Sequence, residues 1–358
     1  MEVSVLELKS KSNKKLIVPT PVVIYSRFSK HNKNYQYSQR IRINSSSLSG
    51  YYYCFQQSFV NVFDVVSHVH FHGLAYNGPS YALDLGAHSA GNRETGWHPS
   101  NRYAVFGECL EYVRYLKKKY AHVKWIWVLP AVENNVEWSV TIASLNVLVE
   151  KYPDIIDGFE FNLHFGPEHY NSLFANICNL NAEYCFNVPH IIFSHYHKTD
   201  MTEYKEQIKR ANHIIIESFG YWRPWLKENK NPDSAILDWM HDYNFYSTFI
   251  HPSKITIGVD TCGVKITKDS MKICPLHKIV ENEDRYITIR NNQNGFSILK
   301  FGDEYYTYDD EVIRKRKTNM VNSLGLEGML MGDITDDIHV KFRFPLFDSL
   351  ASLVQYQK

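Results

Sequence analysis

Short apolar segments separated by polar stretches recur along the whole chain, and eight of them have the length and composition of β-strands. Each is rich in β-branched or aromatic residues and is bounded by polar or turn-forming residues. These segments span residues 22–28, 68–76, 124–129, 157–165, 190–196, 213–221, 254–263 and 327–334. The pattern therefore predicts strands spread along the full length of the chain.

Most of the stretches between these segments carry apolar residues at helical spacing. Residues 138–152, for example, place Ile142, Leu145 and Val149 on one face. The predicted helices span residues 106–120, 138–152, 168–184, 200–211, 233–246, 310–323 and 345–356. Strands that alternate with helices indicate an α/β protein, and eight of them favour a closed parallel (β/α)8 TIM barrel over an open sheet.

The domain organisation predicted from this pattern is simple. Residues 1–20 form an N-terminal tail, and residues 21–358 form one barrel domain. Residues 29–65 are predicted to be a long polar connection after the first strand. Residues 264–306 form a small insertion between the seventh and eighth strands, where apolar segments on both sides of the turn sequence at 291–295 predict a short β-hairpin.

The segment DGFEFNLHF at 157–165 alternates strictly between apolar and polar residues. Its polar face carries Glu160, Asn162 and His164. Successive side chains of a strand point to opposite faces, and a central strand of a parallel sheet is covered on both faces. Three such groups are costly to bury unless they line a cavity, so this face is the first candidate for a functional site.

Composition narrows the classes of function. The chain has 358 residues, 44% of them hydrophobic and 22% charged, as in ordinary globular proteins. Its formal net charge of +1 gives no electrostatic basis for nucleic-acid or membrane partners. Aromatic residues reach 15%, with 25 Tyr and 7 Trp, and such side chains suit either sugar or peptide ligands or a Tyr-rich core.

Cysteine usage and the first residues bear on the cellular compartment. The six cysteines show no CxxC pair and no metal-ligand spacing, and their disulfide pairing stays open. Residues 1–20 contain no apolar run typical of a signal peptide, which indicates a cytoplasmic protein if Met1 is the natural start. A lone glycosylation sequon begins at Asn44 and is weak support for secretion.

The 157–165 segment resembles the signature of the family 18 glycoside hydrolases, the chitinases and chitinase-like lectins, which reads Asp-Gly-x-Asp-x-Asp-x-Glu. Residues 67–71 are similar to that family's second strand, and residues 254–259 to its seventh. Residues 308–310 and 324–329 are similar to its eighth helix–strand unit. The matches occur in the family's order and imply a barrel of that fold and an extracellular location.

The resemblance also implies a chemistry, which this chain keeps only in part. In the family the last Glu of the motif protonates the glycosidic oxygen, and the preceding Asp orients the acetamido group of the substrate, which acts as the nucleophile. Here Asp157 is kept, Glu160 and Asn162 replace the two inner Asp residues, and His164 occupies the position of the acid. No catalytic residue is therefore expected.

Other family positions differ as well. Phe219 and Gly220 stand where the family has Tyr and Asp on the sixth strand, and Gly332 replaces the Trp below the reacting sugar. Groups that act together lose activity together, so the resemblance implies a catalytically inactive protein that binds a glycan of the chito-oligosaccharide type or a protein. The side chains expected to contact a ligand are Tyr25, Trp127, Glu217, Phe219, Tyr221, Trp222 and Asp333, whereas Trp125 is expected to pack between barrel and helices.

Two alternatives remain open at this point. One is a metal-dependent barrel hydrolase that uses His68, His70 and His72, three residues on one face of one strand. The residues that could complete that site are His195, His197 and Asp333. The other is an active glycosidase with rearranged acids, and its candidate acids are Glu133, Glu168 and Glu217. The preferred interpretation includes neither a metal nor a cofactor.

Overall fold

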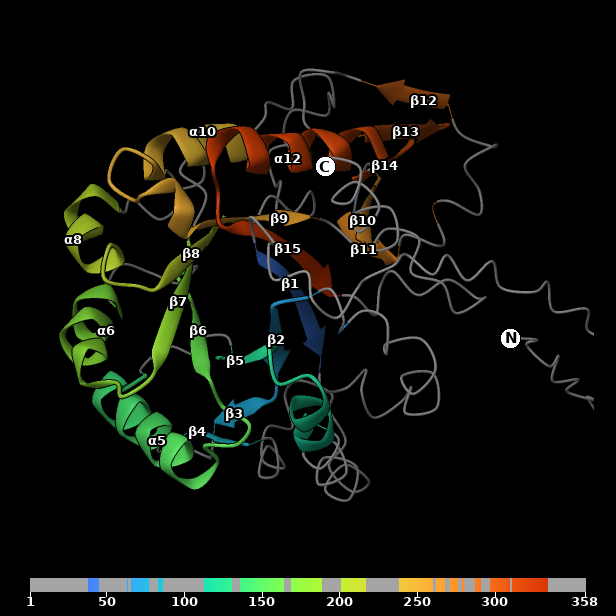
Figure 1. Ribbon diagram of the computed structural model, residues 1–358. Helices are drawn as coiled ribbons and strands as arrows, with labels where there is room; N and C mark the ends of the chain where they lie inside the picture. Colours follow the sequence, from blue (N-terminus) through green and yellow to red (C-terminus); the bar gives the residue numbers. More distant parts are fainter. Residues whose placement is uncertain are drawn as a thin grey trace, which may run out of the picture. The chain divides into compact units, whose positions relative to one another are not determined.

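Eight parallel strands close into a barrel, in the order β1, β2, β5, β6, β7, β8, β9 and β15 (Figure 1). Every neighbouring pair is hydrogen-bonded in parallel register. The strands are β1 (Ser38–Asn44), β2 (His68–His72), β5 (Lys124–Val128), β6 (Gly158–Asn162), β7 (Glu183–Val188), β8 (His213–Ile216), β9 (Ile255–Val259) and β15 (Gly328–Asp333). The predicted TIM barrel is confirmed.

This computed structural model describes part of the chain, and all the described residues belong to a unit that spans residues 37–358. They are residues 38–44, 63, 66–76, 83–85, 113–130, 136–163, 169–188, 201–216, 238–259, 262–267, 271–275, 279, 287–290, 297–309 and 311–333. The predicted tail at 1–20 and the predicted helix at 345–356 lie outside this set, and both remain predictions.

Two of the eight barrel strands differ from the sequence prediction. The first is Ser38–Asn44, within the stretch predicted to be a connection, because it pairs with both β2 and β15 and so closes the barrel. The fifth is Glu183–Val188, which the predicted helix at 168–184 overlapped. The segments predicted in their place, 22–28 and 190–196, lie outside the described residues.

Helices lie around the outside of the strands (Figure 1). Residues 113–119 are helical and precede β5. The other helices are α5 (Trp138–Lys151), α6 (Tyr170–Asn176) with the 3-10 turn Ile177–Asn179, the 3-10 turn Met201–Tyr204 with α8 (Lys205–Ile208), α10 (Asp238–Tyr246), the 3-10 turn Pro252–Lys254 and α12 (Glu311–Leu324). None of the helices within the described residues is long and apolar enough to cross a membrane.

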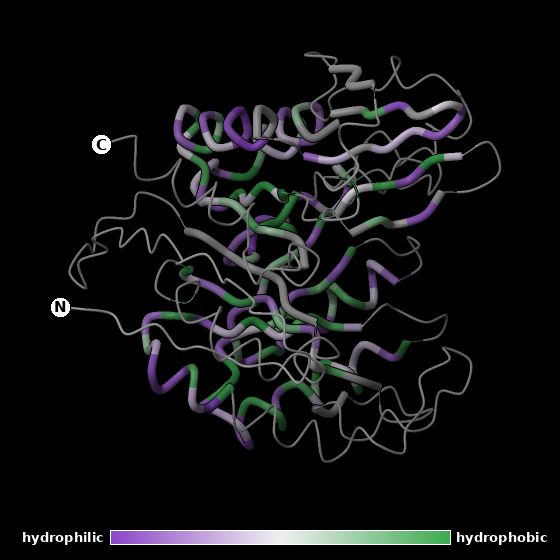
Figure 2. The backbone as a smooth tube through the Cα atoms, turned by 90° about the vertical axis from the view of Figure 1, so that its right-hand side faces the viewer, coloured by the Kyte–Doolittle hydropathy of each residue, from purple (hydrophilic) through white to green (hydrophobic). Residues whose placement is uncertain are grey.

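The main core lies between the strands and these helices. Hydrophobic and hydrophilic positions alternate along both the strands and the helices (Figure 2). The outward residues Val69, Phe71, Trp125, Phe159 and Phe161 are all at most 1% exposed and belong to this core. Alternation along each strand therefore directs its large apolar side chains outward and the remaining side chains into the barrel.

A second sheet is inserted between β9 and α12. Five antiparallel strands pair in the order β11, β10, β14, β13 and β12. They are β10 (Cys262–Ile266), β11 (Met271–Pro275), β12 (Ile287–Arg290), β13 (Ser297–Phe301) and β14 (Glu304–Tyr308). The predicted hairpin is confirmed as β12 and β13, and it is one part of this larger sheet. A separate hairpin pairs β3 (Leu74–Tyr76) with β4 (Leu83–Leu85).

Candidate functional site

The polar face of β6 points into the barrel, where Glu160 contacts a histidine from a strand that is not its neighbour. His70 Nδ1 lies 2.6 Å from Glu160 Oε2, and both side chains are 0% exposed. Asn187 Nδ2 donates to the other carboxylate oxygen of Glu160 at 3.5 Å. Since only β5 lies between β2 and β6, the pair crosses the inner face of β5 and links two strands that are not hydrogen-bonded to each other.

A thiol lies beside this pair. Cys185 on β7 stands opposite Glu160 in the register, and its side chain is fully buried. Its Sγ donates to the carbonyl of Phe159 at 3.7 Å. Ile126, Ile215 and Leu330 pack with Cys185 in an apolar cluster separate from the main core. The middle of the barrel is therefore an apolar layer that holds one imidazole, one carboxylate and one thiol.

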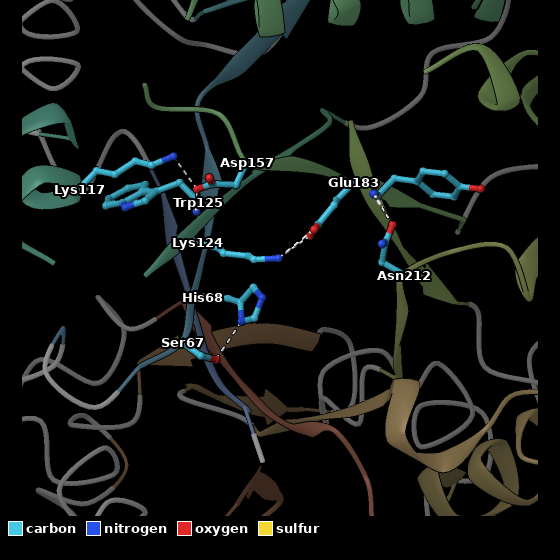
Figure 3. A network of polar contacts seen from close by, with 9 residues as sticks. Ser67, His68, Lys117, Lys124, Trp125, Asp157, Glu183 and Asn212 are labelled. Atoms are coloured by element: carbon cyan, nitrogen blue, oxygen red, sulfur yellow. Dashed lines mark hydrogen bonds and ion pairs between the residues drawn. The ribbon is translucent and has the colours of Figure 1, made fainter. Parts of the chain in front are cut away.

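The Asp157-Gly158 pair that begins the family-like motif has a structural role. Asp157 precedes β6, and its Oδ2 accepts hydrogen bonds from the backbone N–H of Trp125 and from Lys117 Nζ, both at 2.7 Å (Figure 3). A Cβ on Gly158 would lie 2.6 Å from the backbone oxygen of Glu183, so β6 and β7 approach too closely for a side chain there. This Asp-Gly pair therefore fixes how β6 begins between its neighbours.

An ion pair also joins β5 and β7, the two strands that flank β6, at their amino-terminal ends. Lys124 Nζ contacts both carboxylate oxygens of Glu183, at 2.8 and 2.9 Å, and the side chains are 46% and 42% exposed (Figure 3). His68 lies at this end too and hydrogen-bonds Ser67 Oγ at 2.8 Å. His213 on β8 is buried near two histidines of β2. Its ring centroid lies 6.0 Å from that of His68 and 6.3 Å from that of His70.

A buried tyrosine cluster supports the carboxyl-terminal end of β6 from outside. Tyr170 Oη donates to the carbonyl of Leu163 at 2.6 Å, which holds the residue after the strand. Behind it, burial raises the pKa of Tyr246 well above its usual value, and the nearby Asp242 and Tyr170 raise it further. The hydroxyl of Tyr246 is therefore neutral across the physiological range, which suits a group whose role is packing.

The remaining motif positions lie toward the carboxyl-terminal end of β6. Asn162 is its last residue and is partly exposed. His164, the expected replacement of the family acid, lies outside the described residues. Of the polar row predicted from the sequence, the structure thus places Glu160 in the sealed interior and Asn162 at the rim.

The expected ligand contacts are described only in part. Trp127 is fully buried on the outer face of β5, where it packs edge-on against Phe71 at 4.9 Å and its Nε1 donates to the carbonyl of Ile155. Stacking of a sugar on Trp127 does not fit this position, because its ring faces the barrel–helix layer. The backbone of Asp333 ends β15. The other expected contacts lie outside the described residues, namely Tyr25, Glu217, Phe219, Tyr221 and Trp222.

The three histidines of β2 do not form one site. Among the described residues, the group of metal-ligand side chains that comes together is His70, Glu160 and Cys185, without His68 and His72. Alternate residues of a strand are separated along its length, so His68 and His72 lie at opposite ends of β2. The prediction of a three-histidine centre is wrong for this part of the chain. Of the residues proposed for completing it, Asp333 ends β15, whereas His195 and His197 lie outside the described set, as do the candidate acids Glu133, Glu168 and Glu217.

Sequence reasoning missed Cys185 and Asn187, because the strand that carries them was not predicted. The sequence does show the alternation that is typical of a strand. In residues 183–188, Glu183, Cys185 and Asn187 alternate with Tyr184, Phe186 and Val188. That alternation matches β6, and the two strands pair in register from Gly158 to Asn162.

Comparisons with known proteins bear on this architecture. No protein-family model matches the chain, and no curated protein sequence matches it. A mutant of catalytic domain 2 of the group II chitinase of Ostrinia furnacalis matches with a TM-score of 0.67 and 12% identity, over 90% of this chain and 98% of that one. Human YKL-39, a pseudo-chitinase with retained chitooligosaccharide binding, matches with a TM-score of 0.68 and 12% identity, over 89% and 100%.

A family 18 N-acetylglucosaminidase of Paenibacillus barengoltzii also matches, with a TM-score of 0.63 and 9% identity, over 88% of this chain and 99% of that one. At these identities the likeness establishes the fold. The chain has the fold of the family 18 chitinases and of chitinase-like proteins.

Proposed function

We propose that this chain, with its family 18 chitinase-like fold, binds a glycan of the chito-oligosaccharide type and does not hydrolyse it. The observation that carries the proposal is the inner face of β6. Its glutamate, Glu160, is fully buried and hydrogen-bonded to His70, and the next two motif positions in the sequence carry an amide, Asn162, and an imidazole, His164. Substrate-assisted hydrolysis needs a carboxylic acid within reach of the glycosidic oxygen.

Glu160 is poorly placed to serve as that acid. A general acid must come within about 3 Å of the atom that it protonates, directly or through one water. Both oxygens of Glu160 have partners inside the barrel, and its side chain is 0% exposed. Asn162 is nearer the rim but carries no titratable proton. Loss of a general acid alone lowers a rate by about a hundred- to ten-thousand-fold.

Glycan binding is the part of the proposal that the fold supports. Functional groups of such barrels gather at the carboxyl-terminal ends of the strands, where the aromatic residues Phe219, Tyr221 and Trp222 follow β8 in the sequence. Flat aromatic rings suit the apolar faces of sugars. Two proteins of this fold bind such ligands: YKL-39 retains chitooligosaccharide binding, and the Ostrinia furnacalis domain was solved in a complex with a chitooligosaccharide.

Calorimetric titration with chitotetraose tests the binding. The expected result is saturable heat, with an affinity that weakens about twofold to tenfold in Trp222→Ala or Tyr221→Ala, since loss of one stacking ring removes about 0.5–1.5 kcal/mol. Tyr115→Ala is the matched control, because Tyr115 is 55% exposed on the helix at 113–119. Absence of heat and of any thermal shift would count against a glycan ligand and favour a protein partner.

A further inference from the structure

The barrel interior brings together three side chains of types that ligate metals. His70, Glu160 and Cys185 come from β2, β6 and β7, and their ligand atoms all lie within 4.8 Å of one another. All three side chains are 0% exposed. They are far apart in the sequence, and the parallel pairing of β2, β5, β6 and β7 as consecutive strands of the wall brings them together inside the barrel.

We infer that these three residues supply three ligands of a buried site for a divalent ion of the zinc type. An imidazole nitrogen, a carboxylate oxygen and a thiolate sulfur are the three ligand types that Zn²⁺ takes in proteins. The thiolate selects against hard ions such as Mg²⁺ and Ca²⁺, which prefer oxygen ligands. The ion would tie three strands together through the middle of the barrel.

The charges of the site favour a dication. A metal ligates the neutral form of His70 and the anionic forms of Glu160 and Cys185, so the ligands together carry two negative charges. A dication brings the sum to zero, which matters in a fully buried site because uncompensated charge there is costly. Without the ion, Cys185 is a thiol that donates to the carbonyl of Phe159, and His70 and Glu160 share a hydrogen bond. Binding therefore releases protons.

The ligand atoms lie within 4.8 Å of one another, so zinc geometry requires side-chain movements of up to about an ångström. Tetrahedral zinc bonds of about 2.0–2.3 Å place neighbouring ligand atoms about 3.3–3.8 Å apart. The present separation of His70 Nδ1 and Glu160 Oε2 is 2.6 Å, so these two atoms must part by somewhat less than an ångström, roughly 0.7 Å. Asn187 already contacts the second oxygen of Glu160 and can hold that carboxylate in place as an outer partner.

This site differs from the metal hydrolase considered from the sequence. It uses one histidine of β2 instead of three, and its other two ligands, both fully buried, come from β6 and β7. The inference is independent of glycan binding: the protein can hold the ion and fail to bind chitotetraose, or the reverse.

Metal analysis of the full chain tests the inference. Protein folded in the presence of Zn²⁺ and dialysed against a weak chelator is expected to retain close to one zinc per chain, to melt at a higher temperature than chelator-stripped protein, and to lose the ion in Cys185→Ala. Cys178→Ala is the matched control, because Cys178 is an exposed free thiol. With Co²⁺, a thiolate-to-cobalt absorption band is expected in the wild type and in Cys178→Ala and is expected to be absent from Cys185→Ala.

A second variant keeps the test decisive if Cys185→Ala does not fold. Glu160→Gln preserves the shape of the side chain and removes the anionic oxygen, so it too is expected to lose zinc and to weaken the cobalt band. Equal zinc content in the wild type and in whichever of these variants folds would overturn the inference. Zinc below a tenth of an equivalent in the wild type, or a cobalt band without sulfur character, would also overturn it.

Discussion

Two pairs of the barrel, one buried and one exposed, have nearly equal contact distances. Removing the glutamate of each in turn compares their contributions to stability. His70 and Glu160 are 2.6 Å apart and fully buried, whereas Lys124 and Glu183 are 2.8 Å apart and nearly half exposed. Removing one partner of a buried pair leaves the other without compensation and costs about 3–5 kcal/mol. An exposed pair contributes about 0–1 kcal/mol. We therefore expect Glu160→Ala to lower the free energy of unfolding several times more than Glu183→Ala.

Urea denaturation of chelator-treated protein, followed by circular dichroism, measures both changes as shifts of the midpoint at constant slope. The double variant His70→Ala/Glu160→Ala completes a thermodynamic cycle, in which we expect a coupling energy of about 1–3 kcal/mol because the two groups are in contact. Equal costs for Glu160→Ala and Glu183→Ala, or additive costs in the cycle, would refute the view that this pair stabilises the barrel interior.

Three further perturbations test other parts of the structure. Gly158→Ala places a Cβ 2.6 Å from the backbone oxygen of Glu183. We expect the free energy of unfolding to fall by about 1–3 kcal/mol, measured as a lower melting temperature. An unchanged melting temperature would contradict the close approach of β6 and β7. Lys317→Met removes the cation that contacts the buried carboxylate of Asp309, and we expect the free energy of unfolding measured in urea to fall by about 3–5 kcal/mol. A loss below about 1 kcal/mol would show that the pair behaves as a solvated one. The folded-state pKa of Tyr246 lies above its unfolded value, so the unfolded chain ionises first and the free energy of unfolding falls as pH rises above about 10, by up to about 1.4 kcal/mol per pH unit. We expect Tyr246→Phe to flatten that alkaline decline. An unaltered slope would exclude Tyr246 as its source.

Alternation and helical spacing were sufficient to predict the class of fold and six of the eight barrel strands. The two misplaced strands have interspersed polar residues in their sequences. β7 places Glu183, Cys185 and Asn187 on one face, and the sequence of β1 carries Arg40 and Arg42, so both segments lack the apolar density of the others. A barrel strand needs only one apolar face, and a search for apolar runs passes over such strands.

The candidate site was less predictable, for two physical reasons. Contact between His70 and Glu160 depends on the order and register of β2, β5 and β6 in the barrel wall, and no local periodicity carries that information. The burial of Trp127, in contrast, could have been predicted. Trp125 and Trp127 are two positions apart on one strand and share a face, so assigning Trp125 to the barrel–helix layer required the same for Trp127.

The central claim is that this chain keeps the chitinase-like fold without the hydrolytic chemistry. Incubation of the purified protein with a fluorogenic chito-oligosaccharide tests it most directly. We expect release of fluorophore at the rate of the protein-free blank, with no difference between the wild type, Glu160→Gln and His164→Ala. Turnover by the wild type that disappears in either variant would contradict it.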